Sequence, residues 1–185
     1  FVYIKRGAES RVGDAIEQLG IPGIYLKKEY HRYYPENGVI SQVVGYTNID
    51  DQGQAGLELA YNKWLHGAPG KQQVLKDRLG QIVAVVDTIK QAKSGRDLVL
   101  SINNRIQFLA FHVLQQTIAK YHAQSGSVVV LNPKNGDILA MANMPTFDPN
   151  KPYSPPYGRY RNRAVTDVYE PGSVMKAFSL ANALE

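Results

Sequence analysis

Apolar residues recur at helical spacing in two stretches of the first half of the chain. In Ser10–Leu19 they stand at positions i, i+3, i+4 and i+7, and Gly20 and Pro22 follow directly. This spacing predicts a short helix that ends at the glycine. Similar spacing in Ala55–Leu65 predicts a second helix, which ends before the Gly-Ala-Pro-Gly stretch at 67–70.

The remainder of the first half has extended or irregular patterns. Ile24–Tyr34 is rich in tyrosine and closes at Pro35, and Val39–Tyr46 is a short apolar run. Asp50-Asp51-Gln52-Gly53 predicts a turn, and Val74–Lys76 and Gln81–Ile89 predict strands. The polar segment Gln91–Arg96 marks a change of composition. We therefore place a boundary there, between a domain of residues 1–95 and a domain of residues 96–185.

The second half begins with a strand, a long helix and a hairpin. Leu98–Ile102 predicts the strand, and Ile106–Tyr121 carries the longest helical pattern. Two apolar runs follow, Ser127–Leu131 and Asp137–Ala142. The Asn-Gly pair between them tolerates the positive φ that a tight hairpin needs. A helix followed by a hairpin predicts an α+β fold, with the helix lying on an antiparallel sheet.

The last part of the chain alternates between loop and helix. Met144–Tyr160 is rich in proline and tyrosine and is long for a structureless connection, which is typical of functional or mobile loops. Arg161–Tyr169 predicts a helical turn, and a final helix begins near Ser173. An apolar face on this helix predicts partial burial.

Composition limits the possible functions. The 185 residues suffice for one ordinary domain or two small ones, and the absence of cysteine excludes disulfides and thiolate metal sites. The net charge of +5 is compatible with anionic partners but is common in ordinary proteins. No window has the 18 apolar residues of a membrane span. Because the sequence begins Phe-Val-Tyr without methionine, we expect an upstream segment, in which a membrane anchor could lie.

The best candidate for chemistry is Ser173-Val174-Met175-Lys176. Residues three apart share a helix face, so the hydroxyl and the amine can approach each other. Serine becomes a nucleophile when a base removes its proton, and a lysine serves as that base when apolar burial or positive charge keeps it neutral. The alternative is structural, because serine after Pro171-Gly172 is also an ordinary helix N-cap. The four-residue pattern alone does not decide between them.

Other candidate sites have weaker support. Gly67–Lys71 lacks the spacing of a phosphate-binding loop, and the four histidines do not pair at metal-ligand spacing. Arg159–Arg163 interleaves basic and aromatic residues, which fits a solvated loop better than a phosphate, carboxylate or nucleic-acid site. Three carboxylates near the motif could support it, although turn formation or capping is the favoured interpretation: Asp148, Asp167 and Glu170.

Longer stretches decide what the motif alone does not. Arg161–Lys176 (RNRAVTDVYEPGSVMK) closely resembles the segment around the active serine of class B penicillin-binding proteins. Ser125–Asn150 resembles the opening hairpin of their transpeptidase domain, and Asp97–Gln107 its first strand and helix start. Arg32–Glu58 and Gly67–Val83 are similar to the pedestal, and Gly45–Glu58 (GYTNIDDQGQAGLE) is closest to the division-specific, FtsI-type members.

The resemblance implies a fold and an activity. Residues 1–95 correspond to the small mixed pedestal, or dimerisation-type, domain. Residues 96–185 correspond to the first strand, helix and hairpin of a serine β-lactamase-like transpeptidase domain, up to the active-serine helix. The implied activity is peptidoglycan D,D-transpeptidation in septal cell-wall synthesis. Ser173 takes the role of nucleophile and Lys176 that of general base, and β-lactams acylate the same serine. No metal or organic cofactor is implied.

The resemblance also implies partners, a location and missing parts. Expected partners are stem peptides ending in D-Ala-D-Ala, β-lactams, and divisome membrane proteins including a FtsW-type glycosyltransferase, but no nucleic acid. The expected location is the periplasmic side of the bacterial inner membrane, with a single-pass N-terminal anchor outside this chain. The family's Ser-x-Asn and Lys-Thr-Gly motifs, which lie downstream of the serine, are not among the twelve residues after Ser173. We therefore expect this chain to be inactive alone. A non-catalytic divisome interaction module is the alternative function.

Overall fold

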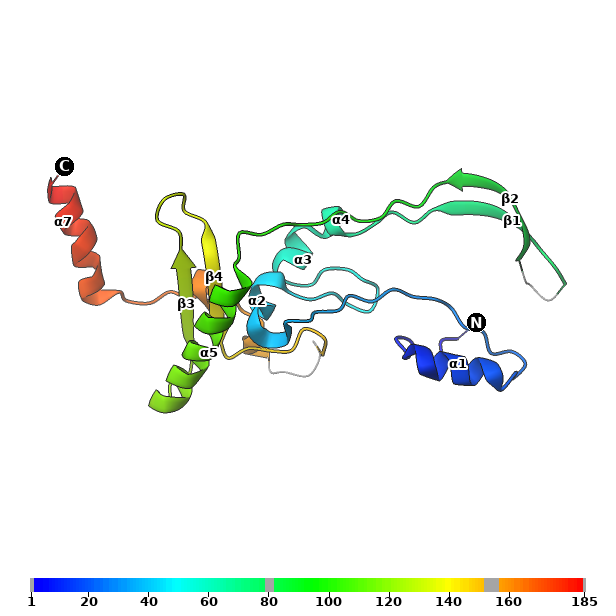
Figure 1. Cartoon of the computed structure of the whole chain (residues 1–185), viewed down its shortest axis with the longest axis horizontal. Coiled ribbons are helices and arrows are strands. Elements are labelled where there is room, and N and C mark those ends of the chain that lie inside the picture. The colour runs from blue at the N-terminus through cyan, green and yellow to red at the C-terminus, as the bar shows by residue number, and fades with distance from the viewer. Residues whose placement is uncertain (1, 79–81, 152–156, 185) are drawn as a thin grey trace.

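The computed structural model describes residues 2–78, 82–151 and 157–184. The molecule is elongated, with a long β-hairpin extending at one end, helix α7 projecting at the other, and a helix-on-sheet layer between them (Figure 1). The α-helices are α1 (Ser10–Gln18), α2 (Ser41–Val44), α3 (Gly56–Ala60), α4 (Asn62–Leu65), α5 (Asn104–Tyr121), α6 (Arg163–Thr166) and α7 (Lys176–Leu184). The strands are β1 (Lys71–Lys76), β2 (Ile82–Lys90), β3 (Gly126–Leu131) and β4 (Ile138–Met144), and the 3₁₀ turns are η1 (Asn37–Val39), η2 (Tyr157–Arg159) and η3 (Gly172–Met175).

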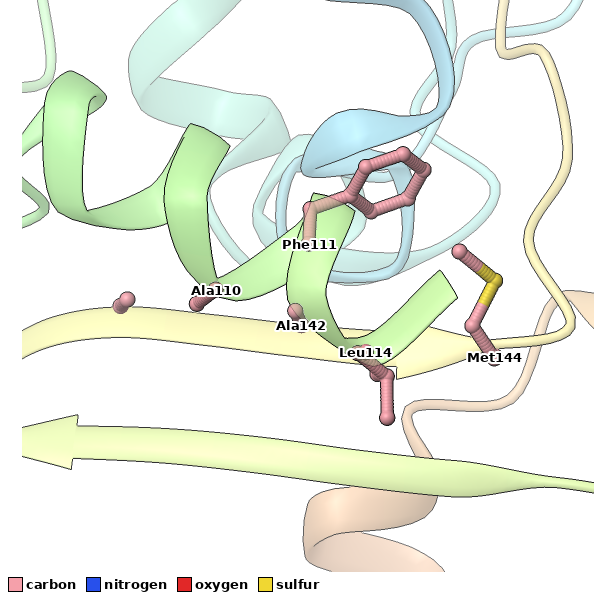
Figure 2. Packing of buried hydrophobic residues seen from close by; sticks show 6 residues of the cluster. Ala110, Phe111, Leu114, Ala142 and Met144 are labelled. Carbon is pink, nitrogen blue, oxygen red and sulfur yellow. The ribbon is translucent and has the colours of Figure 1, made fainter. Parts of the chain in front are cut away.

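The hydrophobic core lies between α5 and the antiparallel β3–β4 hairpin. Figure 2 shows the side chains of α5 meeting those of β4. Alternate residues of a strand face the same side of the sheet, so the α5 face of β4 consists of Ala140, Ala142 and Met144. Two alanines, at most 1% exposed, let the helix approach closely enough to bury Leu114. The predicted α+β layer is confirmed.

The outer edge of β4 is covered by the first turn of α5 and the residues just before it. The Gln107 side chain accepts a hydrogen bond from the Met141 N–H at 2.7 Å and donates to the Met141 carbonyl at 3.1 Å, as a neighbouring strand would. The Asn103 N–H donates to the Leu139 carbonyl. The predicted strand Leu98–Ile102 is wrong, because these residues form no β-ladder; part of the segment protects the sheet edge through isolated bonds instead.

Residues 45–58 form a compact turn-and-helix unit that depends on glycine. Gly45 has φ +84°, and a Cβ there would lie 1.8 Å from the Ala55 carbonyl oxygen. A Cβ on Gly53 would lie 2.0 Å from the Glu58 carbonyl oxygen. The backbones are therefore in contact where these glycines stand, and no other residue type fits without a shift of the chain.

This unit carries a buried charge. Glu58 is 5% exposed, and its carboxylate accepts a hydrogen bond from the Tyr34 hydroxyl at 3.4 Å and pairs with the Arg32 guanidinium at 3.0 Å. Burial raises the pKa of Tyr34 to about 12, so its hydroxyl keeps the proton that it donates.

Side-chain amides join the segment 34–46 to the chain that follows β4. Asn150 accepts from the Tyr34 N–H at 3.0 Å and donates to the Tyr34 carbonyl at 2.9 Å. Gln42 donates to the Pro145 and Arg159 carbonyls. The Tyr46, Phe147 and Tyr160 rings pack together with centroids 4.8–5.8 Å apart. Residues on both sides of the predicted boundary at 95 therefore share one packed unit.

The N-terminal part and the β1–β2 hairpin extend from this unit. Arg6 connects the first residues to the turn at 48–51 through Asp50, at 2.7 Å, and the Ile49 carbonyl. All nine residues of β2 are exposed. Along with the predicted helix at 10–19, the turn at 50–53, the strands at 74–76 and 82–89 and the β3–β4 hairpin are confirmed, although Gln81, where we expected a strand to begin, lies outside the described residues.

The predicted helix Ala55–Leu65 is divided into α3 and α4. Tyr61 leaves helical geometry with φ −109° and ψ 22°, and the Asn62 side chain accepts a hydrogen bond from the Gly53 N–H at 3.0 Å. This bond to the preceding turn competes with a continuous helix. The apolar run 39–46, which had no predicted state, is mainly helical, as η1 and α2.

Candidate active site

Ser173 and Lys176 lie at the junction between η3 and α7. Gly172 has φ +58°, a value that glycine adopts without strain, and it turns the chain from Pro171 into the 3₁₀ turn. The Lys176 N–H then donates a hydrogen bond to the Ser173 carbonyl, which fixes the two residues in a single turn. The predicted α-helix thus begins at Lys176, one turn later than expected, because the serine occupies a tighter 3₁₀ turn.

Both side chains are exposed in this structure. All residues of α7 are exposed, and the neighbouring Val174 and Phe178 are each 68% exposed. The partial burial that we expected for this helix is therefore wrong for the described residues. Lys176 does not have the apolar surroundings that a neutral lysine base needs.

The sheet anchors the chain shortly before Ser173. Asn143 of β4 is 1% exposed, and its Oδ1 accepts from the Ser127 hydroxyl and from the Ala164 N–H, both at 2.8 Å. Its Nδ2 donates to Asn162 Oδ1 at 2.9 Å. Sequence reasoning missed Asn143 and Asn162; the only signal was an asparagine among the apolar residues of Ile138–Met144.

Two arginines and one carboxylate close the α6 turn. Arg161 and Arg163 each donate to Asp167, at 2.7 and 2.8 Å. The hydrogen bond from Arg163, with the positive charges of both arginines, holds the pKa of Asp167 below its ordinary value of 3.8. The cluster at 159–163 therefore engages a carboxylate of its own chain, and the turn interpretation of Asp167 is favoured. Asp148 likewise accepts from the Asn150 N–H within a turn.

The structure gives His112, Ser101 and Asn103 roles in packing and hydrogen bonding. His112 packs against the rings of Phe108 and Phe111, as expected for a packing residue. Ser101-Ile102-Asn103 has the letters of a Ser-x-Asn motif, but Ser101 donates to the Ile138 carbonyl and Asn103 caps α5. Among the described residues, no three histidine, aspartate or glutamate side chains gather as metal ligands do.

The described grooves lie away from the serine. One of about 700 Å³ lies between the N-terminal segment and the turn at 47–49, and its lining includes Tyr30, His31 and Asn150 but none of the described residues after Lys151. In the described part of the chain, no helix combines the length and apolarity of a membrane span. Neither Ser173 nor Lys176 lines the larger groove or the smaller one at residues 32–44, 58 and 149.

Comparison with known families clarifies what this arrangement is. The family model for the penicillin-binding protein dimerisation domain matches residues 5–100, and that for the penicillin-binding protein transpeptidase domain matches residues 126–185. The chain belongs to the penicillin-binding proteins. The second match includes the whole Ser173–Lys176 turn and the sheet that anchors it.

Individual penicillin-binding proteins agree over the whole chain. It is 43% identical over 187 residues to the "Probable peptidoglycan D,D-transpeptidase PenA" of Neisseria meningitidis serogroup B and 39% identical over 185 residues to the peptidoglycan D,D-transpeptidase FtsI of Escherichia coli K12. Both alignments cover 100% of this chain, and 32% and 31% of those proteins. The solved structure of a peptidoglycan synthetase from Bifidobacterium adolescentis aligns with 99% of this chain and 33% of its own, with TM-score 0.70 and 28% identity. The chain thus spans about a third of the length of these relatives.

Proposed function

We propose that this chain is the pedestal (residues 1–95) and the opening part of the transpeptidase domain (residues 96–185) of a division-specific peptidoglycan D,D-transpeptidase. The observation that carries the proposal is the transpeptidase-domain match over residues 126–185, in which Ser173 and Lys176 stand in a single hydrogen-bonded turn. The names of the relatives PenA and FtsI support the reaction, and the name FtsI supports the septal role.

The reaction is acyl transfer through a serine ester. Neutral Lys176 removes the Ser173 proton, and Ser173 Oγ attacks the carbonyl carbon of the D-Ala-D-Ala bond. The peptide bond breaks, terminal D-alanine leaves with a proton on its amine, and the acyl group stays on Ser173. An amine of a neighbouring stem peptide then attacks the ester, which forms the cross-link and frees the serine. The backbone N–H of Ser173 donates one hydrogen bond to the oxyanion, both when the serine is acylated and when the acceptor amine attacks the ester.

The exposure of α7 accounts for the inactivity that we propose for this chain alone. Exposed Lys176 lacks the enclosed surroundings of a catalytic base, and the second oxyanion donor belongs to the Lys-Thr-Gly strand of the complete domain. In the full-length enzyme we propose that further parts of this domain cover α7, surround Lys176 and complete the oxyanion site. A single N-terminal anchor holds that enzyme at the periplasmic face of the inner membrane, beside divisome proteins that include a FtsW-type glycosyltransferase.

The experiment is covalent labelling of the full-length protein with a fluorescent penicillin, followed by peptide mass spectrometry. We expect one adduct, on Ser173, and none in the Ser173→Ala variant. Ser179→Ala is the matched control, because Ser179 lies on α7 and donates only to the Met175 carbonyl. An adduct on another residue, or undiminished labelling of Ser173→Ala, would refute the proposal. The isolated 185-residue chain should remain unlabelled.

A second role as a docking module is favoured by exposed aromatic residues in the pedestal. Tyr25, Tyr30 and Tyr33 are 77%, 79% and 74% exposed on one extended segment, and aromatic side chains are enriched in protein interfaces. Docking and catalysis can coexist in one protein. Ser173→Ala should abolish labelling while leaving binding to divisome proteins unchanged, and a loss of both would contradict an independent docking surface.

A further inference from the structure

The two faces of the β3–β4 sheet have different neighbours. Ala140, Ala142 and Met144 face α5, so by strand alternation Met141 and Asn143 face the opposite side. α6 contacts β3 and β4 there. The α5 side holds the sheet together by apolar burial. The α6 side holds it by a buried amide, which has to be fully hydrogen-bonded to be stable there.

Every hydrogen bond of the Asn143 side chain leads to a specific place. Its carbonyl oxygen accepts from Ser127 directly across the hairpin and from the backbone N–H of Ala164, and its amino group donates to Asn162. Two of these three bonds hold the segment 162–164. An apolar residue could fill the same volume without such bonds, so the amide selects the position of this segment and does more than fill space.

Asn162 transmits this position to α6. Its side chain bonds β4 at two points, through Asn143 at 2.9 Å and through a weak contact with Met141 Sδ at 3.2 Å. Its backbone carbonyl accepts from the N–H groups of Val165 and Thr166, which begins the α6 turn. The paired arginines then close this turn on Asp167.

Among the described residues between α6 and Ser173, Asp167 is the last one whose side chain makes hydrogen bonds, to Arg161 and Arg163. Val168 and Tyr169 are 98% and 78% exposed. Five residues separate Asp167 from Ser173, which allows a span of at most about 20 Å and sets how far the serine can lie from its anchor.

We propose that Asn143 and Asn162 form a latch, a pair of positioning residues that fixes where the Ser173 helix leaves the sheet. The inference rests on the proposed acyl-transfer function. Acyl transfer is sensitive to placement, since an error of about 1 Å in a reacting group can reduce the rate by about 100-fold. A latch of two amides next to the sheet limits such errors without contacting the substrate.

The experiment measures acylation of the full-length enzyme by a fluorescent penicillin, separating the first-order acylation constant from the dissociation constant of the initial complex. Asn162→Ala removes the hydrogen bond between Asn162 and Asn143 without changing any side chain of the α5 core. We expect acylation to slow by about 10-fold or more with little change in initial binding. Asn162→Asp keeps the Oδ1 acceptor for Asn143, so it should stay within about 3-fold of wild type.

Gln107→Ala is the matched control for general loss of stability. Gln107 is 2% exposed and makes three side-chain hydrogen bonds, but they lead to Val39 and Met141 and not to residues 162–164. It should lower the melting temperature at least as much as Asn162→Ala while leaving acylation within about 2-fold, measured well below both transitions. Hydrogen exchange gives a second readout, with protection of the Ala164 N–H lost in Asn143→Ala and kept in Gln107→Ala.

Three outcomes distinguish the hypotheses. The latch is supported if acylation is slower in Asn162→Ala, close to wild type in Asn162→Asp and unchanged in Gln107→Ala. An unchanged acylation constant in Asn162→Ala, or equal losses in Asn162→Ala and Gln107→Ala, overturns it while leaving the acyl-transfer function intact. Labelling that survives Ser173→Ala removes the proposed function, and the latch with it.

Discussion

Replacement of Gly45 by alanine tests the close backbone packing on which the 45–58 unit depends. Gly45 ends α2 with φ +84° and ψ −154°, a region that is essentially restricted to glycine. Its α-carbon faces the Ala55 carbonyl, so an added Cβ would lie 1.8 Å from that oxygen. Ordinary contact requires a separation above 3.4 Å, so the two backbones would have to move apart by more than 1 Å.

The expected cost combines two effects. A non-glycine residue in this region costs about 1–3 kcal/mol in backbone strain. Forcing the Ala55 backbone outward adds about 1–3 kcal/mol of overpacking, because the adjoining Gly56 is also tightly packed, with a Cβ site 2.6 Å from the Val43 carbonyl oxygen. Gly45→Ala should therefore lower the free energy of unfolding by about 2–6 kcal/mol, a large part of the ~5–15 kcal/mol typical of a domain.

Urea unfolding monitored by tryptophan fluorescence is a suitable assay. Trp64 is the single tryptophan and lies on α4, which contacts the α3 helix that begins in the 45–58 unit. Gly136→Ala is the control, because Gly136 has φ +78° but nothing within 4 Å of its Cβ site, so only strain of about 1–2 kcal/mol applies. If the two variants lost the same stability, close backbone contact at Gly45 would not be the reason for the glycine.

Two further predictions concern the core and the α6 turn. Leu114→Ala removes a side chain that is 6% exposed and should cost about 2–4 kcal/mol in urea denaturation, whereas Leu109→Ala, 63% exposed on the same helix, should cost under about 0.5 kcal/mol; equal effects would contradict the placement of the core. The lowered pKa of Asp167 means that its contribution to stability is fully present above pH 3.8 and is lost as the pH falls through the lowered value. Asp167→Asn should thus be less stable than wild type at pH 6 and equal to it below the pKa of the folded protein, and a constant difference in thermal melts across that range would refute the ion-pair assignment.

The sequence predicted the elements whose cause is local. α5 and the β3–β4 hairpin follow from apolar spacing and from an Asn-Gly turn, and both occur within about three residues of their expected bounds. A helix that begins near Ser173 was also predicted. The 3₁₀ geometry at Ser173 was not, because Pro171-Gly172 is compatible with either kind of helix start.

Polar cross-links between distant segments could not be predicted. Asn150 bonds Tyr34 across 116 residues, and Gln107 bonds Val39 across 68. An amide in the sequence gives no indication of which backbone it will meet, because almost every exposed N–H and carbonyl is an equivalent partner. The positioning role of Asn143 escaped prediction for this reason, although its place in an apolar strand was visible.

The hydrogen bonds between Asn150 and Tyr34 and between Gln107 and Val39 have a practical consequence for the design of shorter expressed fragments. Separate expression of residues 1–95 and 96–185 would divide the packed interior between two polypeptides. Several side-chain amides would then lose their carbonyl partners and be exposed to water. We expect such pieces to be poorly soluble when made separately and to associate when made together. A shorter polypeptide from residue 32 to 167 keeps the whole interior and is the better choice for crystallisation.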